Sequence, residues 1–225
     1  MNTPLHYASE NGHTDAIQLL IKHDADVNKK NIFGHTPLHV ASSYGHTDAM
    51  RLLIELGTKI DTTNMYGYTL LHEASCKGYT NTMRLLIEAG ADVNKKNIYG
   101  CTPLYYASYN DRIDAIRLLI DAGTDINMKN NVGWTPLHRA SLDGHVDVMQ
   151  LLIDAGTNVN EKNSIGWTPL HYASDMGHID AMQLLIDNGA KINEKDNNGW
   201  TPLYITISHG HTNATRLLKT YGAHK

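Results

Sequence analysis

The hydrophobic residues of this chain return at a fixed distance along the sequence. Pairs of adjacent leucines recur every 33 residues, within stretches where apolar side chains are spaced three and four positions apart. That spacing places the apolar side chains on one face of a helix. A shorter stretch with a small Ala-Ser pair precedes most leucine pairs, so the pattern predicts two helices per unit. The leucine pairs begin at Leu19, Leu52, Leu85, Leu118, Leu151, Leu184 and Leu217.

A polar motif in the same register marks the start of the first helix of each unit. Thr is a favourable residue before a helix, and Pro is well tolerated at the first helical position. A period of 33 residues with this motif is typical of ankyrin repeats, and the chain resembles that family over its whole length. The resemblance implies an all-α solenoid of stacked helix-turn-helix units with connecting β-hairpin loops. Thr-Pro-Leu-His, or a close variant, begins at Thr3, Thr36, Thr69, Thr102, Thr135, Thr168 and Thr201.

The fifth unit illustrates the local structure that we expect. Asn and Gly in residues 130–134 favour a tight hairpin turn. Thr135 then caps a first helix that runs to about Asp143, and Gly144 ends it in the left-handed conformation that glycine tolerates. A second helix covers roughly residues 146–155.

The repeats account for the whole length of 225 residues. Each repeat of a solenoid buries its apolar face against its neighbours, so the array behaves as one unit. We therefore expect a single domain that spans residues 1–225. Its repeats, numbered one to seven below, are expected at about 1–30, 31–63, 64–96, 97–129, 130–162, 163–195 and 196–225.

Charge and composition argue against several classes of protein. The net charge is −4 and the isoelectric point about 6.4, and the basic residues are scattered, so we expect no nucleic acid as partner. No apolar run approaches the roughly 18 residues that a membrane span needs, and the start of the chain shows no secretory leader. Two cysteines without metal-ligand spacing fit a reducing compartment, so we expect an intracellular, cytoplasmic protein, in the cytoplasm of a host cell if its source is an intracellular parasite or a virus. We also expect a monomer.

The histidines invite a metal or catalytic interpretation, but their repetition favours a structural one. Five of the 14 occupy the same place in the motif, and copies of one position form a row along a solenoid. The family resemblance implies that this His and its Thr brace the hairpin and the helix through hydrogen bonds. We expect no catalysis, metal or cofactor. The five are His6, His39, His72, His138 and His171.

Positions at which the repeats differ are the candidates for binding. They lie at the hairpin tips and on the outer side of the first helix, and the resemblance implies that partners contact this concave surface. Exposed aromatic and Arg side chains are common anchors of protein interfaces. The expected contact residues are Phe33, Tyr66, Tyr68, Tyr99, Tyr105, Tyr106, Tyr109, Trp134, Arg139, Leu142, Trp167, Tyr172, Met176 and Trp200.

Two interpretations stay open for the tryptophans in that set. Trp134, Trp167 and Trp200 occupy one column, so they either stack along the array or bind a partner. For Tyr106, Tyr109 and Arg139 we favour binding, because these positions vary between repeats. The tyrosines of repeat four make it the first candidate for the main contact.

Repeats three and four depart most from the shared pattern. Asn110, Asp111 and Arg112 replace the Gly-His turn in repeat four, so a residue other than glycine should take a positive φ there. Repeat three has Leu70 in place of Pro and Asn81 in place of Asp, which predicts a weaker helix start.

The sequence therefore predicts a non-catalytic module or scaffold that binds another protein. The alternative is a regulatory or targeting fragment or subunit of a larger enzyme or effector whose catalytic part lies elsewhere. A smaller hypothesis concerns modification, because some asparagines resemble ankyrin asparagines that cellular asparaginyl hydroxylases oxidise. These are Asn28, Asn94, Asn127, Asn160 and Asn193.

Overall fold

The computed structural model describes residues 1–224, so the last residue of the predicted seventh repeat lies outside the described part. Fourteen helices and no strands are found in this part of the chain, and the expected all-α fold is confirmed. The helices are α1 (Pro4–Glu10), α2 (Thr14–Lys22), α3 (Pro37–Ser43), α4 (Thr47–Glu55), α5 (Leu70–Lys77), α6 (Thr80–Glu88), α7 (Pro103–Tyr109), α8 (Ile113–Asp121), α9 (Pro136–Asp143), α10 (Val146–Asp154), α11 (Pro169–Met176), α12 (Ile179–Asp187), α13 (Pro202–Ser208) and α14 (Thr212–Thr220).

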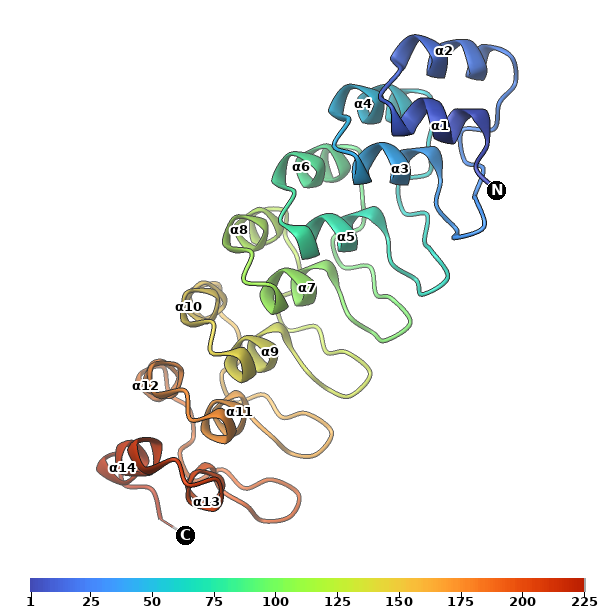
Figure 1. Ribbon diagram of the computed structural model, residues 1–225. Coiled ribbons are helices and arrows are strands. Elements are labelled where there is room, and N and C mark those ends of the chain that lie inside the picture. Colours follow the sequence, from blue (N-terminus) through green and yellow to red (C-terminus); the bar gives the residue numbers. More distant parts are fainter. Residues whose placement is uncertain (225) are drawn as a thin grey trace.

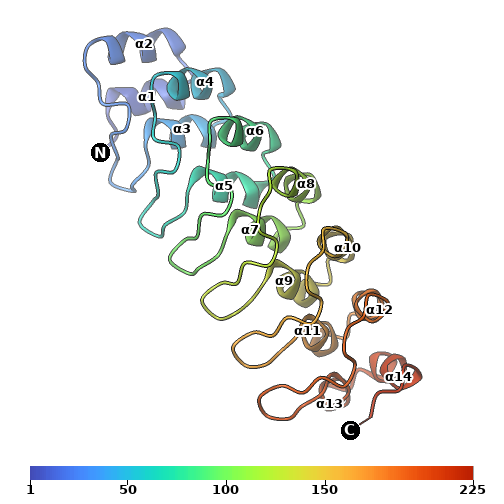
Figure 2. The same ribbon diagram turned by 180° about the vertical axis from the view of Figure 1, so that it is seen from behind.

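The helices form two rows with the chain termini at opposite ends (Figure 1). Odd-numbered helices, which we call inner helices, lie next to the projecting loops, and even-numbered outer helices lie on the far side (Figures 1 and 2). We call the surface formed by the loops and the inner helices the hairpin face. No helix in residues 1–224 is both long and apolar enough to span a lipid bilayer.

Local sequence explains the helix boundaries in repeat five. The Thr135 side chain accepts a hydrogen bond from the His138 backbone N–H at the start of α9, and Pro136 follows as the first helical residue. Gly144 ends α9 with φ 72°, and a Cβ atom there would lie 2.9 Å from the His178 ring of the next repeat. Both expected helices are therefore present, and α10 ends at Asp154, one residue before the expected end.

The core runs continuously between the two rows of helices. Leu137 of α9 and Val148 and Leu152 of α10 are fully buried in repeat five, and the matching residues are buried in the other repeats except repeat one, where Ala16 and Leu20 are partly buried. Each repeat thus covers the apolar face of the next, which is how solenoids gain stability.

The loops have hairpin turns without regular strands. In repeat five the Asn130 N–H donates to the Trp134 carbonyl at 2.9 Å and closes the turn. One further backbone bond, from the Asn131 N–H to the Tyr99 carbonyl at 3.0 Å, connects this loop to the preceding one. A single backbone bond between neighbouring loops does not make the repeating ladder that defines a strand.

The turn of repeat four takes the backbone conformation expected from its missing glycine. Asp111 has φ 55°, in the left-handed region that most residues avoid. Asp24 in repeat one, where later repeats have Gly, also has a positive φ of 62°.

The junction between repeats two and three lacks a hydrogen bond that every other junction has. Elsewhere a side chain just before the outer helix donates to a carbonyl near the end of the preceding inner helix. His46, for example, donates to the Glu10 carbonyl at 2.8 Å, and Arg112, His145, His178 and His211 make the corresponding bonds. Repeat three has Tyr79 at this position, and no hydrogen bond of its side chain is found within residues 1–224.

The same junction is open in two further respects. The Nε2 atom of His39 is buried without a hydrogen-bond partner in the described chain, whereas His72 donates to the Cys101 carbonyl at 3.1 Å. Helices α3 and α5 lie farther apart than other successive inner helices. A crevice of about 450 Å³ separates Tyr44 from Tyr79 at this junction.

Candidate functional site

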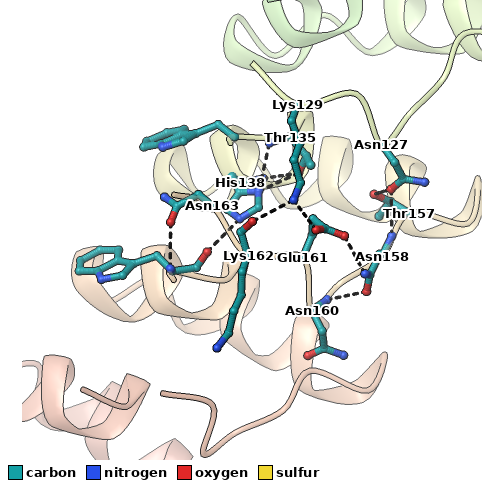
Figure 3. Close-up of polar contacts among 12 residues, drawn as sticks. Asn127, Lys129, Thr135, His138, Thr157, Asn158, Asn160, Glu161, Lys162 and Asn163 are labelled. Carbon is teal, nitrogen blue, oxygen red and sulfur yellow. Dashed lines mark hydrogen bonds and ion pairs between the residues drawn. The ribbon is translucent and has the colours of Figure 1, made fainter. Parts of the chain in front are cut away.

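The motif histidines hold the hairpin face in shape. The Thr135 backbone N–H donates to Nδ1 of His138 at 3.1 Å, so Nε2 carries the ring proton. Nε2 then donates to the Trp167 carbonyl of the next loop at 3.1 Å, as Figure 3 shows. Burial lowers the pKa of His138 to about 4, which keeps the ring neutral. These contacts confirm the structural interpretation of the motif.

The extended segments before each loop, which we call arms, connect the repeats on a separate surface. The Oδ1 atom of Asn127 accepts bonds from Thr157 Oγ1 at 3.0 Å and the Asn158 N–H at 3.1 Å (Figure 3). Lys129 lies between Glu161, at 2.5 Å, and the Lys162 carbonyl, at 3.1 Å. The five asparagines of the hydroxylation hypothesis all accept a bond from the next repeat: Asn28, Asn94, Asn127, Asn160 and Asn193.

Large apolar side chains are exposed at the loop tips. Phe33, Tyr66 and Tyr99 are 61%, 49% and 51% exposed, in agreement with their expected position on the surface. The residues just before them are also exposed, and the sequence interpretation missed them although they form a column of their own. They are Ile32, Met65 and Ile98.

The tryptophan column packs on a tyrosine of an inner helix. The rings of Trp134 and Trp167 lie 4.4 Å and 4.8 Å from the Tyr172 ring, between centroids. Trp167 also donates to Asp196 at 2.9 Å, and Trp200 packs on Tyr204 at 5.2 Å and stays partly exposed. Trp134 and Trp167 therefore pack along the array through Tyr172, whereas Trp200 packs within its own repeat.

Tyr172 was expected as an exposed contact residue, and that expectation is wrong. Its side chain is 6% exposed, because the two indole rings cover it. Its hydroxyl accepts a bond from Asn163 Nδ2 at 2.7 Å, and burial raises its pKa to about 12. The residue braces the loops of repeats five and six.

Tyr106 has a similar position in repeat four and is half-buried. Its hydroxyl lies 2.5 Å from that of Tyr68 and accepts a bond from Asn97 at 2.9 Å. Tyr105 is also half-buried, with its pKa raised to about 12 by burial. These tyrosines thus form packing and hydrogen-bond contacts within the array.

The remaining expected residues lie near the ends of the inner helices. The Arg139 guanidinium lies 3.9 Å from the centre of the exposed Tyr109 ring and pairs with both oxygens of Asp143, at 2.6 Å and 2.7 Å. Leu142 is half-buried and Met176 is exposed. The exposed part of the expected set is therefore concentrated at the loop tips, with Tyr109 and Met176 at the inner helices and Trp200 just before α13.

Within residues 1–224, no three His, Cys, Asp or Glu side chains are grouped closely enough to hold a metal ion. The free thiols are those of half-buried Cys76 and buried Cys101.

Comparison with known proteins agrees with this architecture. A family model described as ankyrin repeats (3 copies) matches residues 1–64, 58–130 and 122–196. A search of curated proteins finds no significant match to the chain. The family matches together cover residues 1–196, which include α1 to α12.

Proposed function

Because the chain belongs to the ankyrin repeat family, whose repeats generally mediate protein–protein interaction, we propose that it binds a partner protein on its hairpin face. It acts as a single domain and a monomer. It is a non-catalytic module or scaffold in a reducing compartment, where Cys76 and Cys101 stay free thiols.

The main support for this proposal is the exposure of large apolar side chains at the loop tips. Six large side chains, two on each of three successive loops, face solvent at equivalent positions. The fold does not require them, because the corresponding tip of repeat seven has Asn197 and Asn198. Contiguous exposed apolar surface of this kind commonly marks an interaction site. The six side chains are Ile32, Phe33, Met65, Tyr66, Ile98 and Tyr99.

The chemistry of the face supports binding over catalysis. Four of the five motif histidines, all except His39, are buried donors that hold loop carbonyls, and burial keeps the pKa of His72 and His138 near 4. A general base near neutral pH needs a pKa close to the working pH and access to a substrate. Nucleic acid is an unsuitable partner because several Lys side chains bond to neighbouring carbonyls and the net charge is −4.

An affinity capture from the native cell, read by mass spectrometry, tests the proposal. The double variant Tyr66→Ser/Tyr99→Ser removes two exposed rings from the loop tips. The control variant Tyr79→Ser/Tyr221→Ser makes the same changes at two exposed tyrosines outside the tips. We expect a partner that the wild type and the control retain and the tip variant loses. A partner retained equally by all three forms would contradict the proposed site.

The second candidate is a regulatory or targeting part of a larger enzyme or effector. One observation favours it. Leu19 of α2 is 58% exposed, whereas the matching leucines of later repeats are partly or fully buried, and Pro4 is exposed although the other motif prolines are buried. This apolar end of the array fits a further helical element. Immunoblotting of the native protein distinguishes the candidates, because a larger protein would migrate well above 25.0 kDa.

A further inference from the structure

The charged side chains of the arms and of the inner helices are unevenly paired. On the arms, Lys30, Lys96, Lys129 and Lys162 each donate to a carbonyl of the next repeat. Arg139 of repeat five is held by Asp143. Within residues 1–224, the acidic side chains of the inner helices in repeats one and three form no ion pair.

Glu73 of α5 is the clearest of these. It occupies the helix position that Tyr106 and Tyr172 occupy in repeats four and six, so it faces the loops. Its side chain is half-buried, and no hydrogen bond or ion pair of its carboxylate is found in residues 1–224. Burial raises the pKa of Glu73, and nearby His35 and Lys77 oppose that rise. The Lys77 ammonium group lies over the Tyr79 ring, 5.4 Å from its centre.

The same face has a depression between repeats one and two. It has a volume of about 210 Å³ and is lined by both loop and inner-helix residues. Phe33 and Tyr44 form aromatic walls, and His35 is shared between the depression and the surroundings of Glu73. Glu10 lies at its edge, where its interaction with the hydroxyl raises the pKa of Tyr44.

Carboxylates beside aromatic rings are suited to one class of side chain. An Arg or Lys head group pairs with a carboxylate, stacks on aromatic rings and lays its aliphatic stem on apolar surface. A half-buried carboxylate without a direct ion pair loses hydration that its more distant neighbours His35 and Lys77 only partly replace. A basic side chain of a partner supplies the missing interaction, and the net charge of −4 favours the approach of such a partner.

We propose that Glu73 and Glu10 pair with two basic side chains of an extended partner segment that lies across the inner helices of repeats one to three. The inference rests on the proposed function and specifies the partner chemistry of the same face. The two carboxylates are two repeats apart, which is about 20 Å at the usual spacing of packed helices and more here, because α3 and α5 lie farther apart than the other inner helices. An extended chain covers about 20 Å in about six residues, so the basic residues stand about six or more positions apart.

Selection from a random 12-residue peptide library displayed on phage tests the inference with the intact chain as bait. We expect selected peptides to carry Arg or Lys at two positions about six or more residues apart. A synthetic selected peptide should bind Glu73→Gln and Glu10→Gln about tenfold more weakly than the wild type. In each variant, one basic residue of the peptide should no longer contribute to the affinity. Glu88→Gln is the matched control, because Glu88 is an exposed carboxylate at the end of outer helix α6.

A charge exchange separates direct pairing from a structural effect. Glu73→Lys should no longer bind the selected peptide. Binding should return when the basic residue of the peptide that pairs with position 73 is replaced by Glu. Thermal melts of all variants should match the wild type, since the carboxylate makes no bonds in the described chain. Selected peptides that lack basic residues, or that bind Glu73→Gln unchanged, would overturn this inference and leave the proposed function intact. Selection of no peptide at all would count against both.

Discussion

Two tyrosines of the hairpin face show how surroundings decide the contribution of a side chain. Tyr172 is enclosed by Trp134 and Trp167, and its hydroxyl is bonded to Asn163. Tyr66 is half exposed at a loop tip. Loss of the Tyr172 ring would leave a cavity between two indoles, whereas water would fill the space left by the exposed Tyr66 ring.

The same substitution should therefore have different effects at the two positions. Tyr172→Ala should lower the free energy of unfolding by about 3 kcal/mol, as large-to-small changes in packed sites do. Tyr66→Ala should change it by less than about 0.5 kcal/mol. Urea unfolding of the two variants measures both values. Equal effects would show that the indoles do not support Tyr172 in solution.

The buried motif histidines should make stability depend on pH. Burial lowers the pKa of His39 to about 3 and that of His72 and His138 to about 4, from an ordinary value of 6.5. Below pH 6.5 the unfolded chain binds protons that the folded chain does not bind. The free energy of unfolding is therefore highest above pH 6.5. It falls as the pH is lowered, by about 1.5 kcal/mol per histidine at pH 5.5.

Urea midpoints at pH 7.5 and pH 5.5 check this prediction in a window where most carboxylates remain ionised. His138→Gln should reduce the pH dependence by the share of one histidine. His23→Gln changes an exposed histidine at the end of α2 and is the control. Identical midpoints of the wild type at the two pH values would mean that the motif histidines are not buried as neutral rings.

At the scale of the helix and the loop, the sequence predicts what local chemistry determines. The Thr cap, the motif Pro and Gly144 define α9, and leucine periodicity defines α10, so their boundaries could be predicted within one residue. The exposure of Tyr66 could also be predicted, because a hairpin tip has no neighbour above it. The burial of Tyr172 could not, since it depends on how two loops fold back onto one helix.

The open junction between repeats two and three was also beyond the sequence. The absence of a Gly-His pair in repeat three is visible, but Arg112 of repeat four also replaces that His and still bonds to the Cys76 carbonyl at 3.2 Å. A substitution alone therefore does not show that a junction opens. Its effect depends on whether the new side chain reaches the carbonyl of the preceding repeat.

Restoring the histidine should close this junction. In Tyr79→His, the new ring can donate to the carbonyl of Ser43, as His46 donates to the Glu10 carbonyl one repeat earlier. One such hydrogen bond should add about 1 kcal/mol to the free energy of unfolding. Amide hydrogen exchange should slow in residues 43–47 and 78–80, where the crevice lies.

The reverse change at a closed junction is the matched control. His178→Tyr removes the bond to the Leu142 carbonyl, now 3.1 Å long, and should speed exchange at the turns of repeats five and six. If Tyr79→His leaves both stability and local exchange unchanged, the missing bond is not what keeps repeats two and three apart.

Over the whole molecule, stability depends on how strongly each repeat is coupled to the next. In a solenoid, contacts reach only the adjacent repeats, so the weakest junction determines where unfolding begins. The junction between repeats two and three retains arm contacts, such as the bond from Lys30 to the Thr63 carbonyl at 2.7 Å, while its inner helices lie apart. Repeats one and two should therefore unfold before repeats three to seven.

The distribution of tryptophan allows this order to be measured without added labels. Trp134, Trp167 and Trp200 lie in the loops of repeats five to seven, so their fluorescence reports the C-terminal part, whereas far-ultraviolet circular dichroism reports all helices. In urea, the circular dichroism signal should begin to fall before the fluorescence changes, because repeats one and two contain no tryptophan. Two probes that change together would instead indicate a single cooperative transition.

Tyr79→His provides the test of the cause. If the missing bond weakens the coupling, the two curves should coincide in this variant, and the chain should unfold as the single domain that its length and repeats predict. Curves that already coincide in the wild type would show that the arm contacts suffice to couple all seven repeats. Curves that stay apart in Tyr79→His would place the weak coupling at another junction.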